Sequence, residues 1–133
     1  MTTTTTAQPA AVAAAHRYLT AADSMLRGHG TLGSAAVSGG WWPKACACLI
    51  RLALETAIDA YWQRTSPAVA HYGSGRTKLL LLRNRCERTL TRQATFAWAS
   101  LSQAAHHHCY ETAPSVTELR HLHGSVLDII ARL

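Results

Sequence analysis

Apolar residues recur every three or four positions in three stretches of the chain, which is the spacing of one face of an α-helix. The stretches cover residues 12–26, 90–108 and 119–133. Each therefore predicts an amphipathic helix whose apolar side faces a common core. The positions on these stripes are Val12, Ala15, Leu19, Ala22, Leu26, Leu90, Ala94, Ala97, Leu101, Ala104, His108, Leu119, Leu122, Val126, Ile129, Ile130 and Leu133.

A fourth stretch, residues 43–64, is apolar on nearly every side. Its polar residues form one thin stripe at intervals of four: Arg51, Glu55, Asp59 and Gln63. A helix with so narrow a polar face is surrounded by other elements, so this stretch predicts the central helix of the fold. Pro43 suits the first turn of such a helix, where its missing N–H costs nothing.

Glycines, prolines and capping residues separate these stretches. Gly28, with Gly30 and Gly33 behind it, is expected to end the first helix. Ser115 and Glu118 form a capping box in front of the last helix. The run Leu79–Leu82 fits a buried helix or a buried strand equally well by its pattern alone. Residues 1–9, with their run of threonines, have little to bury and are expected to be a disordered tail.

Composition settles the fold class. The 133 residues include 24 Ala and 16 Leu but only 4 Ile and 5 Val. Ala and Leu favour helices, and scarce β-branched residues disfavour a sheet. We therefore expect one all-α domain over residues 10–133, a single compact bundle of four to five helices.

Cysteine usage and hydropathy predict where the protein works. Cys46, Cys48, Cys86 and Cys109 form no C-x-x-C pair and are expected to be small buried residues in a reducing compartment. No apolar run is long enough to cross a bilayer, and residues 1–15 lack the features of a secretory signal. These observations predict a cytoplasmic protein without membrane contact. No Gly-rich phosphate loop is present, and no cofactor is expected.

Positive charge concentrates in one segment of a chain whose net charge is +6. Six basic residues lie within 17 positions, opposed by Glu87 alone: Arg76, Lys78, Arg83, Arg85, Arg88 and Arg92. Such a cluster is typical of a surface that binds nucleic acid or another polyanion. The alternative is a solubilising face around the leucine run.

Two further groups contain titratable side chains. The first is the run of three consecutive histidines, His106, His107 and His108. Consecutive helical residues point about 100° apart, so the three cannot share one metal, and no metal site is expected. Their structural alternative is packing and a favourable charge at a helix C-terminus. Glu55 and Asp59, four apart on one helix face, fit a general acid–base pair, but Arg51 on the same stripe would hold them ionised, so a solvated stripe is favoured.

Part of the chain resembles a known class of proteins. The run through Trp98, Leu101-Ser102, His106-His107-His108, Tyr110-Glu111, Pro114, Glu118-Leu119 and Val126 is similar to small helical proteins of GC-rich actinobacteria. The helix order over residues 42–133 resembles HEPN domains, compact helical domains of which many are dimeric ribonuclease toxins or nucleotide-binding modules.

This resemblance implies a module that binds RNA or another polyanion, within a toxin–antitoxin or phage-defence system. It also implies a homodimer or a cognate protein partner. Catalytic HEPN domains carry an Arg, then four to six other residues, then a His. His106 and His108 stand about where that His would be, so the resemblance makes them the candidate catalytic residues, but residues 100–103 contain no Arg. Whether the protein is an enzyme therefore stays open. The alternative function is a non-catalytic protein–protein interaction or dimerisation module with no nucleic-acid role.

Overall fold

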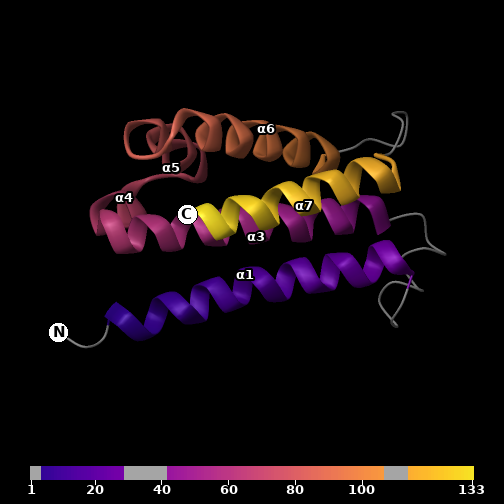
Figure 1. Cartoon of the computed structure of the whole chain (residues 1–133), viewed down its shortest axis with the longest axis horizontal. Helices are drawn as coiled ribbons and strands as arrows, with labels where there is room; N and C mark the ends of the chain where they lie inside the picture. Colours follow the sequence, from indigo (N-terminus) through magenta and orange to yellow (C-terminus); the bar gives the residue numbers. More distant parts are fainter. Residues whose placement is uncertain (1–3, 29–41, 107–113) are drawn as a thin grey trace.

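The computed structural model describes residues 4–28, 42–106 and 114–133, and these contain helices and turns but no strand. Figure 1 shows the long helices lying side by side along the length of the bundle. The predicted all-α class is confirmed, and two short helices, α4 (Pro67–Tyr72) and α5 (Gly75–Leu81), bring the described α-helices to six, above the four to five expected. The elements are α1 (Thr4–Arg27), α3 (Trp42–Thr65), α4 (Pro67–Tyr72), α5 (Gly75–Leu81), the 3₁₀ turn η1 (Leu82–Asn84), α6 (Arg88–Ala105) and α7 (Val116–Arg132).

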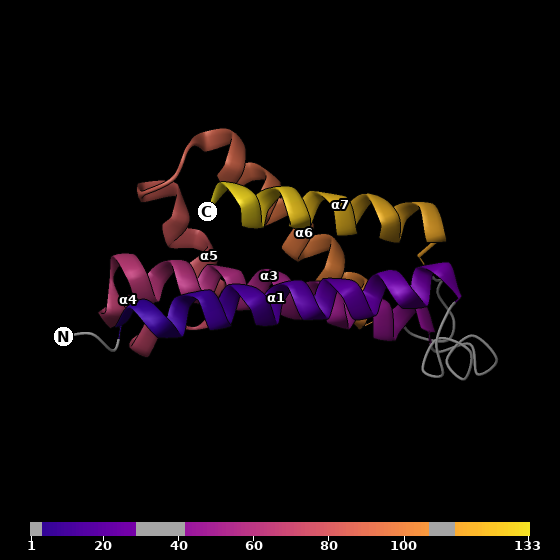
Figure 2. The same ribbon diagram turned by 60° about the horizontal axis from the view of Figure 1, so that its bottom comes forward.

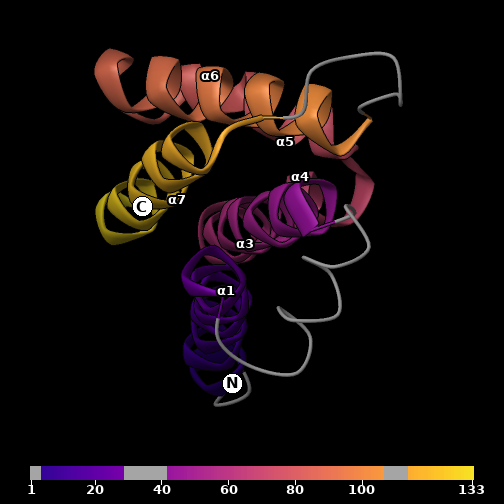
Figure 3. The same ribbon diagram turned by 90° about the vertical axis from the view of Figure 1, so that its right-hand side faces the viewer.

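Helix α3 is the centre of the bundle, as its thin polar stripe predicts. It packs against α1, α4, α5, α6 and α7. Viewed along the bundle, it lies between α1 on one side and the α6–α7 pair on the other (Figure 3). Ile50, Ala53 and Leu54 are completely buried. The apolar sides of this helix therefore supply the middle of the core.

The three predicted stripes supply the rest of the core. Leu19 of α1, Leu101 of α6 and Val126 of α7 are buried in the same cluster as Ile50 of α3. The predicted stripe positions that the structure describes are buried, except that Val12 and Leu133 are partly buried. His108 lies outside the described residues.

The leucine run is helical, which resolves the ambiguity of its pattern. It crosses from α5 into η1, with Leu79 and Leu82 buried and Leu80 exposed. Buried Trp62 of α3 fixes this segment, because its indole Nε1 donates a hydrogen bond of 2.9 Å to the carbonyl of Lys78. The turned view in Figure 2 shows α5 between α3 and α6.

The helix ends follow local chemistry, with one exception. Gly28 adopts a φ of 70°, and its N–H bonds to the Met25 carbonyl, so it ends α1 as predicted. Ser115 caps α7 by accepting a 3.1 Å hydrogen bond from the Glu118 N–H. The exception is the start of α1, which lies at Thr4 and not near Ala10. Residues 4–9 of the expected tail thus belong to a helix, because threonine weakens a helix without ending it.

Candidate functional site

Five of the six residues of the predicted basic segment are exposed at one end of the bundle. They follow one another through α5, η1, the turn after it, and the first two turns of α6. No ion pair to a carboxylate joins any of the five within the part of the chain that the structure describes. We call this set the basic end: Arg76, Arg83, Arg85, Arg88 and Arg92.

Lys78, the sixth residue of the segment, has a different place. Its Nζ lies 2.6 Å from Oδ1 of Asp59, and its side chain is only 16% exposed. Lys78 therefore ties α5 to α3 and is not part of the basic end. Because the Asp59 carboxylate offsets the charge of this ammonium, Lys78 attracts a phosphate only weakly.

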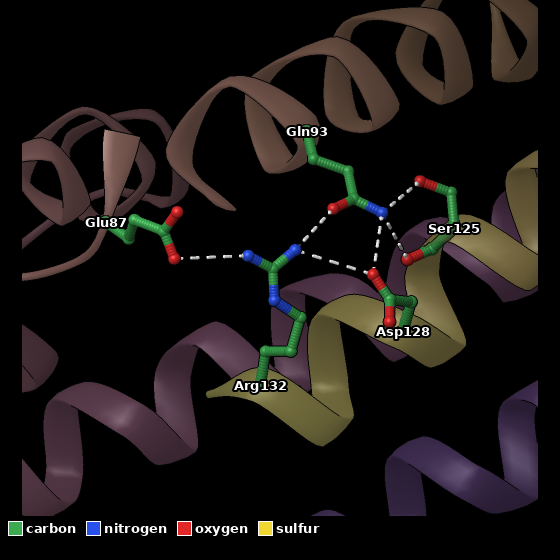
Figure 4. A network of polar contacts seen from close by, with 5 residues as sticks. All are labelled: Glu87, Gln93, Ser125, Asp128 and Arg132. Carbon is green, nitrogen blue, oxygen red and sulfur yellow. Dashed lines mark hydrogen bonds and ion pairs between the residues drawn. The ribbon is translucent and has the colours of Figure 1, made fainter. Parts of the chain in front are cut away.

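The only carboxylate of the segment, Glu87, is bound by an arginine from the end of the chain (Figure 4). Its Oε2 lies 3.4 Å from Nη2 of Arg132. The other nitrogen, Nη1, donates a 3.0 Å hydrogen bond to Oε1 of Gln93 and lies 3.5 Å from Oδ2 of Asp128. Gln93 in turn donates to Ser125 Oγ at 3.1 Å and to Asp128. This network fixes the start of α6 against the end of α7 and offsets the charge of Glu87.

Glu55 and Asp59 line a cavity of about 450 Å³ between α3, α5 and α6. Glu55 Oε1 lies 3.4 Å from Arg51 Nε and accepts a 3.2 Å hydrogen bond from Trp98 Nε1. Asp59 is bound by Lys78. The sequence favours a solvated stripe that Arg51 holds ionised. The two carboxylates are partly exposed, but each has a separate cation, and their charges are balanced within the chain. The cavity therefore does not favour a ligand of one charge.

His106, one of the two candidate catalytic histidines, does not lie at the basic end. His106 is exposed at the C-terminal end of α6, and its backbone N–H bonds to the Ser102 carbonyl. His108 lies outside the described residues. Because α6 has 18 residues, about 27 Å of helix separate His106 from Arg88 at the other end. Within one chain, His106 and the arginines do not form a common site.

Metal-ligating side chains do not gather in groups of three or more within residues 4–28, 42–106 and 114–133. The Nε2 atom of His123 lies 2.8 Å from the carbonyl of Leu19, so this histidine links α7 to α1. Cys46 is fully buried, and this burial raises the pKa of its thiol to about 12. Cys46 thus confirms the expectation of a small buried residue. Cys48 and Cys86 are only partly buried, and Cys109 lies outside the described residues.

Sequence reasoning missed a groove of about 520 Å³ on the outer side of α6 and α7. Phe96 of α6 stands at its edge and is 64% exposed. Gly124 and Asp128 of α7 line the opposite side. A signal was present in the sequence, because Phe96 lies off the apolar stripe of its helix, which runs through Ala94 and Ala97.

Comparison with known proteins gives no family for this chain: no family model, no curated protein and no solved structure matches it. Within the described residues, none of the helices has the length and apolar character needed to cross a membrane.

Proposed function

We propose that the protein binds RNA, or another phosphate-rich polyanion, through the basic end. The observation that supports this most strongly is the exposure of five arginines without a carboxylate partner among the described residues. Surface arginines in folded domains are commonly offset by acidic neighbours. Here the one acidic residue in the segment, Glu87, is bound by Arg132 instead.

The choice of arginine supports phosphate as the target. A guanidinium presents a planar set of donors that matches two phosphate oxygens, whereas an ammonium acts as a point charge. Arg88 and Arg92 lie one turn apart on α6, so they are neighbours on the helix surface. The other three lie on the segment that leads into α6, which Lys78 and Trp62 hold against α3. The basic end is thus supported by a fixed scaffold.

Binding, and not cleavage, is the activity we propose. Within one chain, His106 lies about 21 Å along α6 from Arg92 and about 27 Å from Arg88. The resemblance to HEPN domains, and the role in a toxin–antitoxin or phage-defence system that it implies, belong to this proposal and rest on the sequence alone.

The test is the salt dependence of binding to a single-stranded RNA of mixed sequence. Each phosphate contact contributes roughly 0.7 to the slope of log K against log salt. Replacing Arg83, Arg85 and Arg88 by Gln should weaken binding and reduce the slope by roughly 2. His106→Ala should leave both affinity and slope unchanged.

The control variant is Arg17→Gln, which removes an exposed guanidinium from α1. We expect it to bind RNA as the wild type does, since Arg17 is not at the basic end. Equal binding by the folded triple variant and the wild type would contradict the proposal. A protein–protein interaction module would then be the better interpretation.

A further inference from the structure

The outward side of α7 is not covered by the rest of the described chain. Helix α7 packs on α3, α1 and α6 through its buried residues, such as Leu119, Val126 and Ile129. Its opposite side is exposed along the whole helix, between α1 and α6 (Figure 3). The exposed positions on that side are Thr117, Arg120, His121, Gly124, Leu127, Asp128 and Ala131.

Gly124 lies in the middle of this exposed side. It is an interior residue of a 17-residue helix, where glycine lowers helix stability relative to alanine. Apart from its two neighbours in the chain and the backbone of its own helix, a Cβ added to Gly124 would have no atom of the described chain within 4 Å. Packing inside the chain therefore does not explain the glycine, whereas close approach of another helix from outside would.

The charges on this side have a symmetric arrangement about Gly124. Arg120 lies four residues before it and Asp128 four residues after it. Arg120 contacts α1 through Leu26 and Asp23, but its side chain is still 48% exposed. Asp128 contacts Arg132, and its side chain is 55% exposed. Along α7 the two are about 12 Å apart, so they cannot pair with each other within one chain.

We propose that a second copy of this chain binds here, with the two α7 helices antiparallel and crossing at Gly124. In this register, residues whose numbers sum to 248 lie opposite each other. Arg120 of each copy then meets Asp128 of the other, which gives two equivalent ion pairs related by a two-fold axis. Exposed Phe96, at the edge of the groove beside Gly124, is placed to pack across the same axis.

Self-complementary charge is the reason for choosing a second copy over RNA as the occupant. A polyanion would require one sign of charge, as at the basic end, but this surface has Arg120 and Asp128 at equal distances from its centre. A surface with a positive group on one side of a small residue and a negative group on the other is complementary to a second copy of itself rotated by 180°. This inference goes beyond the proposed function and can be tested without RNA.

The test is the oligomeric state, measured by analytical ultracentrifugation over a range of protein concentrations. Arg120→Asp and Asp128→Arg should each weaken the dimer by roughly tenfold or more, because each places like charges opposite one another. The double variant R120D/D128R should restore dimerisation, because it reverses both partners. Within one chain the two side chains are too far apart to compensate each other, so this rescue would report a contact between copies.

Two further variants complete the design. Gly124→Leu adds a side chain where the monomer has open space, so it should fold normally but hold the two helices apart. Arg17→Asp, a charge reversal on α1, should leave the dimer unchanged. The proposal fails if the wild type is monomeric at every concentration, if the double variant dimerises no better than the single variants, or if Gly124→Leu dimerises like the wild type. Should Arg120→Asp unfold through loss of its contacts to α1, Asp128→Arg and Gly124→Leu still decide the question.

Discussion

Two leucines on α3, two positions apart, differ in burial, so truncating each of them tests which side of α3 faces the core. Leu54 is completely buried against α3's neighbours, whereas Leu52 is 42% exposed. Truncating Leu54 to Ala removes the burial of its side chain, worth about 1.5–3 kcal/mol, and leaves a cavity in the core. Together these effects should lower the free energy of unfolding by about 2–5 kcal/mol. Truncating Leu52 removes only part of that burial and encloses no void, so we expect a loss of about 1 kcal/mol.

Urea denaturation followed by circular dichroism measures both variants against the wild type. The two substitutions delete the same atoms from the same helix, so intrinsic helix propensity cancels between them. The difference between their urea midpoints therefore reports the difference in burial between the two positions. Equal losses, or a larger loss for Leu52→Ala, would refute the placement of α3 with Leu54 in the core.

Two further predictions concern single contacts. Ser115→Ala removes the cap of α7 and should cost about 0.5–2 kcal/mol, measured as a lower urea midpoint; an unchanged midpoint would contradict the cap. The Cys46 thiol, with its pKa raised to about 12, should resist alkylation in the folded protein at pH 8 and react once urea unfolds it. Since the folded state keeps this proton longer than the unfolded state, the Cys46 contribution to stability should decrease as the pH rises from about 9 towards 12, and Cys46→Ala should reduce that decrease.

The helices and the core could be predicted from the sequence because they depend on local spacing. The stripe from Leu90 to Ala104 and the Ser115 cap each involve residues within a few turns of one another, and both are present. The positions of apolar residues three and four apart in the sequence are enough to determine which side of a helix is apolar. The start of α1 was less predictable, because threonine disfavours a helix only weakly, whereas Pro9, which predicts a helix boundary, lies inside α1.

The ion pairs at the candidate site join residues far apart in the sequence, so no local pattern predicts them. Lys78 pairs with Asp59, 19 positions away, and Arg132 pairs with Glu87, 45 positions away. In the sequence, nothing distinguishes the residues of these two pairs from other charged residues nearby. Only the packing of α5 on α3 and of α7 on α6 brings them together. Lys78 is thereby separated from the basic end, and Glu87 no longer opposes it.

The two proposed surfaces have a geometric relation that yields a last prediction. Arg132, at the end of α7, lies beside Glu87 at the start of α6, so the basic end is at the C-terminal end of α7. Antiparallel pairing of two α7 helices then places the two basic ends at opposite ends of the dimer, separated by about the 25 Å length of α7. A short RNA should bind each copy independently, and Gly124→Leu should not change the affinity for it.

A longer RNA that spans both basic ends should bind the wild-type dimer more tightly than it binds the Gly124→Leu variant, because the second contact of the same RNA is intramolecular. Fluorescence anisotropy with the two RNAs measures this difference, and an equal effect of Gly124→Leu on both would contradict the separation of the two surfaces.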